Sequence, residues 1–599
     1  MKINIYPVFC RSCRIAGLIW VAAAILTGCQ TPGEFRTDVD RQAQRIINEK
    51  QAQVLGRQTD FSLEKPSDIL RRQILEHTSL PVAGPASLGS DKLPPVAHWP
   101  ESGYPTSAGA QGHSSYDLNT PLSISLVRAL QIGARNNFEF MTKKETVFQS
   151  ALALYLEQDA FRTSLIGQIQ SLVSSDRSQT PSREGTLNSG TITGTRQLEN
   201  GIKLSTALAV DLATLLTSGS NSSFGIKADA SLSIPLLRGS GRHIVTEPMQ
   251  QAEQNLVYAI LDFERFKKKF AVSIGRDYLT ILKQMDGVKN AWEDYQSRLI
   301  SSRRSRRLAE AGRLKEIEVD QSVQTELVAR QRWVSAQEQY KKQMDAFKVQ
   351  LGLPPDADID LYPDELNRLA VVPDMGAGPL ELSERKAVEM ALENRYDLQV
   401  ITGKVFDAQR AVVVAADALG AELTFLGSAA IGERRTITTA DLENARLRTD
   451  KGVFSALLTL DLGFDRTAEA ITYRNSFILL EQAVRNAQSL EDTIKIEIRS
   501  RLRELLEARE TLVIQAKSVE LALKRVKSIT LFMDAGRAQT RDLLEAQDAL
   551  LEAQNSLTSA RVNYRIAELE IQRDMGLLVV TDTGLWQEYS PEANTNGKK

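Results

Sequence analysis

The sequence contains two copies of one pattern, and this repeat limits the possible fold more than any other feature. Ala311-Gly312-Arg313 recurs as Ala535-Gly536-Arg537, an offset of 224 in the numbering. Leu351-Gly352-Leu353 recurs at the same offset as Met575-Gly576-Leu577, so the two glycines have the same separation in both copies. A repeat held in register over this length indicates a repeated architecture. The chain is therefore predicted to be an internal duplication rather than a row of unrelated domains.

The first copy is predicted to carry an insertion. Ala129-Leu130 corresponds to Ala387-Val388 at an offset of 258, whereas Ser231 to Leu237 corresponds to Leu457 to Gly463 at an offset of 226. The difference, 258 − 226, places 32 additional residues between about 170 and 225. Apolar residues alternate in part of this stretch, which fits either an additional hairpin or an extended outer loop.

Each copy reads as helix, strand, strand, long helix, turn and returning helix. Proline is absent from 249 to 353 and from 380 to 590, so very long helices are permitted. A helix from 248 to 311 would be roughly 90–100 Å long. Gly312 and Gly536 then fit positions just past a helix end, where glycine tolerates a left-handed conformation. In the second returning helix two apolar rows recur every seven residues, which predicts coiled-coil packing: Leu543, Leu550, Leu557, Tyr564 and Ile571, with Ala546, Ala553, Ala560 and Ala567.

A run of strict alternation predicts a membrane-spanning strand. From Ile226 to Leu236 apolar residues alternate with Lys227, Asp229, two serines and a proline. This length and pattern match a strand with one face towards lipid and one towards water. Weaker patterns at about 161–172, 419–431 and 454–462 bring the expected number to four strands per chain. An open four-stranded sheet cannot span a bilayer, so several chains would have to share one barrel. The alternative is a soluble hairpin packed on helices.

Residues 1–28 are predicted to be a lipoprotein signal peptide. Basic residues precede a 12-residue apolar run that is too short to span a bilayer as a helix. Leu26-Thr27-Gly28-Cys29 resembles the bacterial lipobox, in which the cysteine receives lipid and becomes the N-terminus. Gln30, rather than Asp, favours the outer membrane by resemblance to sorted lipoproteins. The alternative is an ordinary signal peptide with a chance cysteine at position 29.

Composition argues against other functional classes. The 73 basic and 75 acidic residues give a net charge of −2, without the basic excess of nucleic-acid-binding proteins. Two of the three cysteines precede the predicted cleavage point, and the four histidines lack metal-binding spacing. No cofactor, metal site or enzymatic activity is therefore expected, apart from the lipid on Cys29. The low aromatic content, 6%, fits alanine-rich helix seams better than several compact cores.

Taken together, the sequence resembles the TolC-type outer-membrane efflux family over about residues 117–580. The resemblance rests on Ile234-Pro-Leu-Leu-Arg-Gly-Ser-Gly241 before the first long helix, on the Ala-Gly turns, and on Asp542-Leu-Leu-Glu-Ala-Gln547. It implies an α+β membrane protein in which three chains form a 12-stranded β-barrel continued by a long α-helical coiled-coil barrel. The implied segments are 1–28, 29–116 (extension and linker), 117–352 (first repeat), 353–384 (inter-repeat, equatorial), 385–578 (second repeat) and 579–599 (tail).

The resemblance also implies site residues. Asp542 and Glu545 occupy the place of the acidic pair that gates the family's pore, and a ring of such carboxylates would attract cations. The alternative is that both are ordinary helix-start residues. Gly312, Gly536, Arg313 and Arg537 would lie at the tips that meet a periplasmic adaptor, although exposed arginines there would also complement the helix dipole.

We accordingly predict a homotrimeric outer-membrane channel of a Gram-negative-type bacterium with a periplasmic helical portion. It would serve a tripartite efflux system passively, with a periplasmic adaptor, an inner-membrane transporter and outer-membrane lipid as partners, and without nucleic acid. One alternative is the outer channel of type I protein secretion. Another, from a different class, is a periplasmic coiled-coil scaffold lipoprotein.

Overall fold

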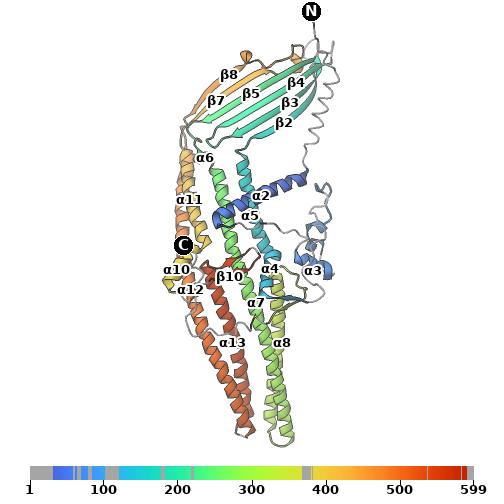
Figure 1. The fold of residues 1–599 in the computed structure, drawn as a ribbon, viewed down its shortest axis with the longest axis vertical. Coiled ribbons are helices and arrows are strands. Elements are labelled where there is room, and N and C mark those ends of the chain that lie inside the picture. Colours follow the sequence, from blue (N-terminus) through green and yellow to red (C-terminus); the bar gives the residue numbers. More distant parts are fainter. Residues whose placement is uncertain are drawn as a thin grey trace, which may run out of the picture.

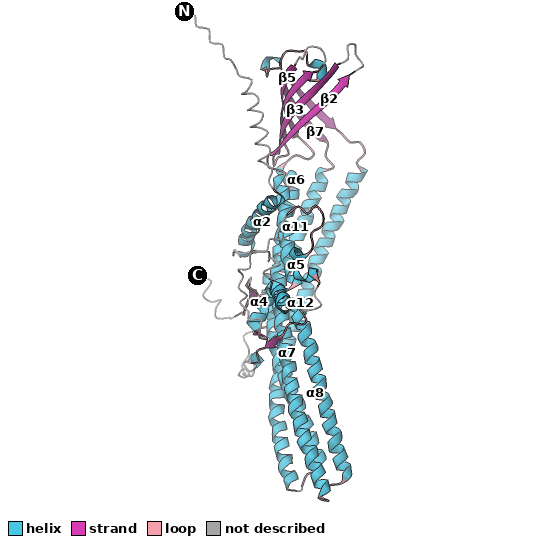
Figure 2. Cartoon of the chain, turned by 90° about the vertical axis from the view of Figure 1, so that its right-hand side faces the viewer, coloured by secondary structure: helices cyan, strands magenta, loops and turns pink. Residues whose placement is uncertain are grey.

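The computed structural model describes residues 31–57, 61, 63, 69–78, 84–101, 121–176, 183–216, 222–363, 365–366, 380, 382–535, 537–581 and 583–589. The predicted signal peptide and Cys29 lie outside the described residues, as does Gly536. The chain is elongated, with a strand sheet at one end and long helices running from it to the other (Figures 1 and 2).

Four long helices dominate the molecule. The first long helix, α7, spans Glu247–Glu310 (64 residues), and its counterpart α12 spans Thr467–Asp534 (68 residues). At 1.5 Å per residue each is about 100 Å long. The returning helices α8 (Glu316–Gln350) and α13 (Thr540–Asp574) have 35 residues each. These bounds confirm the long helices, with Pro248 only in the first turn of α7, and the reversal of the chain after Ala311 and Ala535.

Most of the heptad seam of α13 is buried, as the spacing predicts, with Leu550, Leu557 and Ala567 partly exposed. Ala546 and Ile571 have no exposed surface, and Ala560 and Tyr564 are buried beside Ile498 of α12. The helix packs against both α12 and α7. Small alanines at every seventh position let these neighbours approach closely, which is how the seam fixes the helix pair.

The sheet has six strands, in the order β2-β3-β4-β5-β7-β8, and every neighbouring pair is antiparallel. The prediction of four strands per chain is therefore wrong, and three chains with six strands each would not give the predicted 12-stranded barrel. The predicted insertion adds a hairpin rather than a long outer loop. The strands are β2 (Ser164–Asp176), β3 (Arg183–Gln197), β4 (Lys203–Leu215), β5 (Ser222–Pro235), β7 (Glu422–Glu433) and β8 (Val453–Asp461).

The main core lies midway along the helices, where short elements surround α7. Helices α4 (Leu126–Asn136) and α5 (Phe138–Asp159) pack on α7, while α10 (Glu384–Asn394) and α11 (Tyr396–Asp417) pack on α12. Strand β1 (Leu122–Ile124) pairs with β6 (Ile359–Leu361), which joins the start of the first repeat to the inter-repeat segment. Aromatic rings concentrate here, with Phe140 in contact with the rings of α7.

The remaining elements are short. Helix α2 (Pro32–Leu55) begins with a capping box formed by Thr31 and Glu34 and packs on α5 and α7. Helix α3 spans Leu70–Thr78, and two 3-10 turns, η2 (Pro85–Leu88) and η3 (Ser90–Lys92), follow it. Helix α6 (Arg242–Val245) precedes α7, and β9 (Val579–Val580) pairs with β10 (Trp586–Gln587) near the C-terminus. Among the described residues, every helix is too short or too polar to cross a membrane.

Candidate functional site: a two-faced sheet and a helical tip

The register of the sheet separates an apolar face from a polar one. Leu208 of β4 is paired with Ala228 of β5, which is paired with Ile431 of β7. Since side chains directly opposite each other share a face, the register places apolar residues of all six strands on one face of the sheet. Its large members are Leu165, Ile169, Val173, Ile192, Leu204, Leu208, Val210, Leu212, Phe224, Ile226, Leu232, Ile234, Phe425, Ile431, Phe454, Leu458 and Leu460.

Large apolar side chains on this face are exposed in the single chain. Ile169 is 71% exposed, Phe454 is 65% exposed and Leu458 is 60% exposed. A contiguous exposed apolar surface of this extent marks a surface that is covered by a partner or by lipid. The shortest strand, β8, has 9 residues and the longest, β3, has 15 residues. Strands of this length can span a bilayer when tilted, so the sheet presents a surface suited to hydrocarbon.

The opposite face is mainly polar. On β5 it carries Lys227 and Asp229, which form an ion pair of 2.7 Å, and two serines follow in the same row. Ser428 of β7 and Ser455 of β8 share a hydrogen bond of 2.7 Å on this face. The period-two division into apolar and polar faces is the pattern of strands that separate lipid from water.

The edges of the sheet fit a closed assembly. Among the described residues, β2 is paired only with β3 and β8 only with β7. Strand β2 runs away from the helices and β8 runs towards them (Figure 1). If strand β2 of one copy paired with strand β8 of another copy, the two strands would be antiparallel, like every neighbouring pair inside the sheet.

The α7–α8 and α12–α13 turns lie at the end of the molecule farthest from the sheet (Figure 1). Of the predicted tip residues, Gly312 and Arg313 lie in the first of these turns and Arg537 lies in the second. Gly312 has φ +71°, and the amide of Arg313 donates to the carbonyl of Leu308 at 2.8 Å. In the second turn the amide of Arg537 donates to the carbonyl of Phe532 at 2.8 Å, which is the equivalent bond of the second repeat. Both bonds close helix C-termini in the same way. Gly312, Arg313 and Arg537 are exposed at these turns.

The predicted gate carboxylates both have partners within the chain. The amide of Gln539 donates to Oδ2 of Asp542 at 3.0 Å, so Asp542 caps the start of α13. Arg525 of α12 donates to Glu545 at 3.1 Å, and both side chains are about half exposed. Asp542 thus caps a helix start, and the role of both carboxylates in a pore gate stays a prediction.

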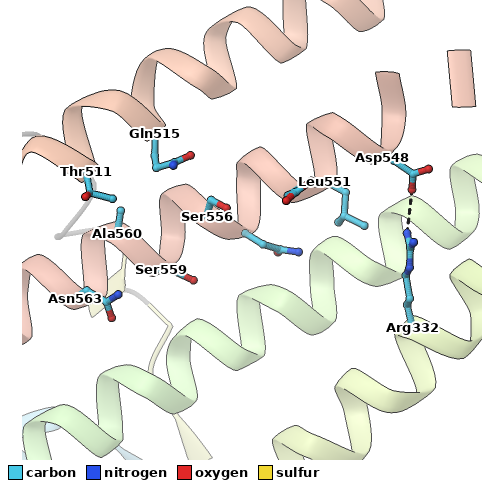
Figure 3. A pocket seen from close by; sticks show the side chains of 11 residues that line it. Arg332, Thr511, Gln515, Asp548, Leu551, Ser556, Ser559, Ala560 and Asn563 are labelled. Atoms are coloured by element: carbon cyan, nitrogen blue, oxygen red, sulfur yellow. Dashed lines mark hydrogen bonds and ion pairs between the residues drawn. The ribbon is translucent and has the colours of Figure 1, made fainter. Parts of the chain in front are cut away.

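A groove of about 600 Å³ with mixed polar and apolar lining runs beside α12 and α13 (Figure 3). At one end Asp548 accepts a hydrogen bond of 2.9 Å from Arg332 of α8 and forms an ion pair of 2.9 Å with Arg298 of α7. The remaining lining is mostly uncharged: Thr511, Gln515, Leu551, Glu552, Asn555, Ser556, Ser559, Ala560 and Asn563. Sequence reasoning missed this groove because its lining comes from both members of a helix pair and from α8.

A buried charge cluster joins three helices in the core region. Arg395, whose side chain is 2% exposed, donates to Asp397 at 2.8 Å and to Glu497 of α12 at 2.7 Å. Arg265 of α7 donates to the same Asp397 at 2.8 Å. Burial raises the pKa of Asp397, but the two arginines outweigh burial and hold that pKa below its usual range. Burial also lowers the pKa of Lys268 to about 8.

Among the described residues there is no group of His, Cys, Asp and Glu side chains placed to hold a metal ion. The described residues present an apolar face, a polar face, two open strand edges and a helical tip. In such an arrangement the apolar face can contact lipid, and the polar face can line a path for solutes.

Comparison with solved structures finds similar folds among outer-membrane channels. The outer-membrane channel CmeC of Campylobacter jejuni superposes with a TM-score of 0.55 and 13% identity, covering 78% of this chain and 88% of that chain. The outer-membrane protein VceC of Vibrio cholerae gives 0.54 and 12%, covering 75% and 96%. The MtrE outer-membrane channel of Neisseria gonorrhoeae, in its open state, gives 0.53 and 12%, covering 76% and 89%. No family model and no curated protein matches the sequence.

The chain therefore has the fold of bacterial outer-membrane channels built from a strand sheet and long helices. Within that class it is the TolC-type fold, as the resemblance of the sequence implies, with a sheet that is two strands wider than predicted.

Proposed function

We propose that this protein is a lipid-anchored outer-membrane channel that passively conducts substrates out of the cell as part of a tripartite efflux system. The observation that carries the proposal is the six-stranded sheet, apolar on one face and polar on the other, set on helices about 100 Å long. The sheet would lie in the outer membrane, while the helices would cross the periplasm towards an adaptor and an inner-membrane transporter.

The channel is completed by copies of the same chain. The open edges β2 and β8 cannot remain unpaired in hydrocarbon. The exposed apolar residues of α12 also recur at seven-residue spacing, as in the pairs Ile471 and Ile478, and Ile514 and Leu521. Such rows are interfaces in coiled-coil assemblies. With three chains, as the resemblance implies, 3 × 6 strands give an 18-stranded barrel.

The two halves of the helical tube are inferred to be a duplication. The returning helices have the same length, and the carbonyls of Lys348 and Gln572, at equivalent positions of the two repeats, accept equivalent bonds at their ends. Gly352 and Gly576 both have φ +76° at these ends. A tube made of two similar helix pairs per chain places six similar tips around the axis of a trimer.

Single-channel recording in planar bilayers tests the proposal. Purified full-length protein should migrate as a heat-modifiable oligomer and produce discrete conductance steps. The scaffold alternative predicts instead a protein that is soluble without detergent and gives no conductance. The type I secretion alternative shares the channel activity and is distinguished by the adjoining gene, which would encode a transporter for a protein substrate.

A further inference from the structure

The loop of residues 434–452, here called the mouth loop, joins β7 to β8 at the end of the sheet that is far from the helices (Figure 1). It does not simply extend away from the sheet. Its first half turns back past β5, and its short helix η4 (Ile437–Thr439) contacts β3 and β4. The loop therefore lies over strands that are two and three places away from β7 in the sheet.

A buried carboxylate holds the start of the mouth loop. Asp211 of β4 has no exposed surface and lies on the polar face, in register with Ser189 and Gly225. Arg434 donates to both of its oxygens, at 2.9 and 3.1 Å, and the amide of Arg435 donates to it at 3.1 Å. Charge-assisted and bidentate bonds of this kind are the strong class.

The second arginine of the loop is buried as well. Arg435 is 5% exposed and donates to Ser223 of β5 at 2.9 Å and to the carbonyl of Glu443 at 2.6 Å. The return half of the loop is tied to β5 by backbone bonds, since the amide of Ala445 donates to the carbonyl of Phe224 at 2.7 Å. Both halves of the mouth loop are thus fixed to the sheet.

Beneath the mouth loop the polar face is locally apolar. Ala213 and Leu215 of β4 form a small buried cluster with Ile437 and Ala440 of the loop. They occupy the same row of β4 that carries Lys203 and Ser205 at the end near the helices. Two glycines on this face let the mouth loop approach the sheet closely. A Cβ at Gly225 would lie 2.6 Å from the backbone nitrogen of Arg435, and a Cβ at Gly185 would lie 3.0 Å from the side chain of Ile437.

We propose that the mouth loop is a fixed constriction on the water-filled side of the barrel, which sets the size limit for solutes at its outer end. This inference rests on the proposed channel function. The polar face is the one that must face water if the apolar face meets lipid, and Asp211 places the first half of the loop on the polar face. Three copies of this first half then project inwards from the wall of one barrel.

The mouth loop is seated on the additional hairpin. Strands β3 and β4, which widen the barrel from four to six strands per chain, also supply Asp211, Ala213 and Leu215 as the seat of the loop. Barrels of 16 to 18 strands enclose an aqueous channel rather than a packed interior. A loop that folds inwards narrows such a channel. The two arginines that attach the loop are themselves paired, Arg434 with Asp211 and Arg435 with Glu433.

Release of the loop should widen the pore. Asp211→Ala and Ile437→Ser each remove one attachment and should raise single-channel conductance, by about twofold or more if the loop sets the narrowest radius. Cells that carry either variant should also become sensitive to large hydrophilic antibiotics that the outer membrane normally excludes. Arg448→Ala is the matched control, because Arg448 lies in the same loop and pairs only with the exposed Asp450.

A second experiment does not depend on the stability of those variants. Thr438 is exposed on η4, so a bulky thiol reagent attached to Thr438→Cys should lower the conductance. The same reagent on Asp450→Cys, in the half of the loop that contacts β7, should leave it unchanged. Unaltered conductance in labelled Thr438→Cys, or in correctly assembled release variants, overturns the constriction while leaving the channel function intact. Absence of conductance in the wild-type protein would remove the channel function itself.

Discussion

At the residue scale, the charge cluster around Arg395 shows how helices α7, α11 and α12 are joined. Arg395 follows α10, Asp397 begins α11, Arg265 lies on α7 and Glu497 lies on α12. Buried ions are favourable only when each has well-placed partners. The cluster meets this condition with opposite charges from four helical segments, so it fixes how those segments sit against one another.

Removal of one charge from this cluster should make stability depend less on pH. Because the pKa of Asp397 is lower in the folded chain than in the unfolded one, ionised Asp397 stabilises the fold above the ordinary aspartate pKa of about 3.9, and the contribution is lost as the pH falls through the folded value. Asp397→Asn should lower the thermal midpoint at pH 7 and converge with the wild type at the acidic end. Asp345→Asn, which removes an exposed carboxylate paired with Lys348, is the control with little expected effect.

The predicted gate depends on two single carboxylates, Asp542 and Glu545. Asp542→Ala with Glu545→Ala should raise conductance or weaken the cation preference, as a ring of carboxylates would require. The loss of the Asp542 cap should cost about 1 kcal/mol locally, so oligomer integrity is measured alongside conductance. Asp492→Asn, on the exposed surface of α12, provides a comparison variant. Conductance and selectivity equal to the wild type would show that the two carboxylates do not line the pore.

At the element scale, two glycines with the same backbone conformation have different reasons to be glycine. Gly352 ends α8 with φ +76°, and a Cβ there would lie 2.0 Å from the Asn136 carbonyl oxygen. Gly312 ends α7 with φ +71°, but nothing lies within 4 Å of its Cβ position. The turn at Gly352 packs against the core, whereas the turn at Gly312 is an exposed tip.

We therefore expect Gly312→Ala to cost only the backbone strain of a left-handed alanine, about 1 kcal/mol. Gly352→Ala should cost several times more, since the carbonyl of Asn136 must also move. Thermal unfolding in detergent, followed by circular dichroism, measures both. Equal losses of stability in the two variants would contradict the close approach at Gly352.

The strands give a second element-scale prediction. Leu232→Arg places a charge on the apolar face of β5 and should prevent stable insertion, at about 2–4 kcal/mol for a site near the middle of the bilayer. Ser231→Arg, one residue earlier, places the same charge on the polar face and should be tolerated. The amount of heat-modifiable oligomer in outer-membrane fractions reports both outcomes, and equal amounts would argue that the face assignment is wrong.

Local patterns explain why some elements were predictable and others were not. The heptads of α13 and the alternation of β5 are each visible within one segment. The strand β3 is not, because its apolar face contains Gly190, Ile192 and Gly194, and only pairing with Ile169 and Leu208 gives it an apolar surface. The bond from Arg434 to Asp211 joins positions that are far apart in the sequence, so no local pattern marks the mouth loop.

At the scale of the whole molecule, the number of strands and the number of chains determine the pore together. Six strands per chain would give 12 strands in a dimer and 18 in a trimer. The helical tube that we propose is trimeric, so the oligomer should have the mass of three chains in detergent. Native mass spectrometry, with chemical cross-linking in intact membranes as a check, distinguishes the two. A dimer would restore a 12-stranded barrel and would contradict the threefold ring of gate carboxylates.

The two open edges of the sheet have a genetic consequence. A subunit whose β8 edge is blocked, for example by proline at Ser455, could still join a neighbour through β2 but could not close the ring. If such subunits were expressed at the same level as normal ones and assembled at random, about one trimer in eight would contain three normal chains. Alleles that damage β8 should therefore be dominant, whereas alleles that abolish synthesis of the chain should be recessive.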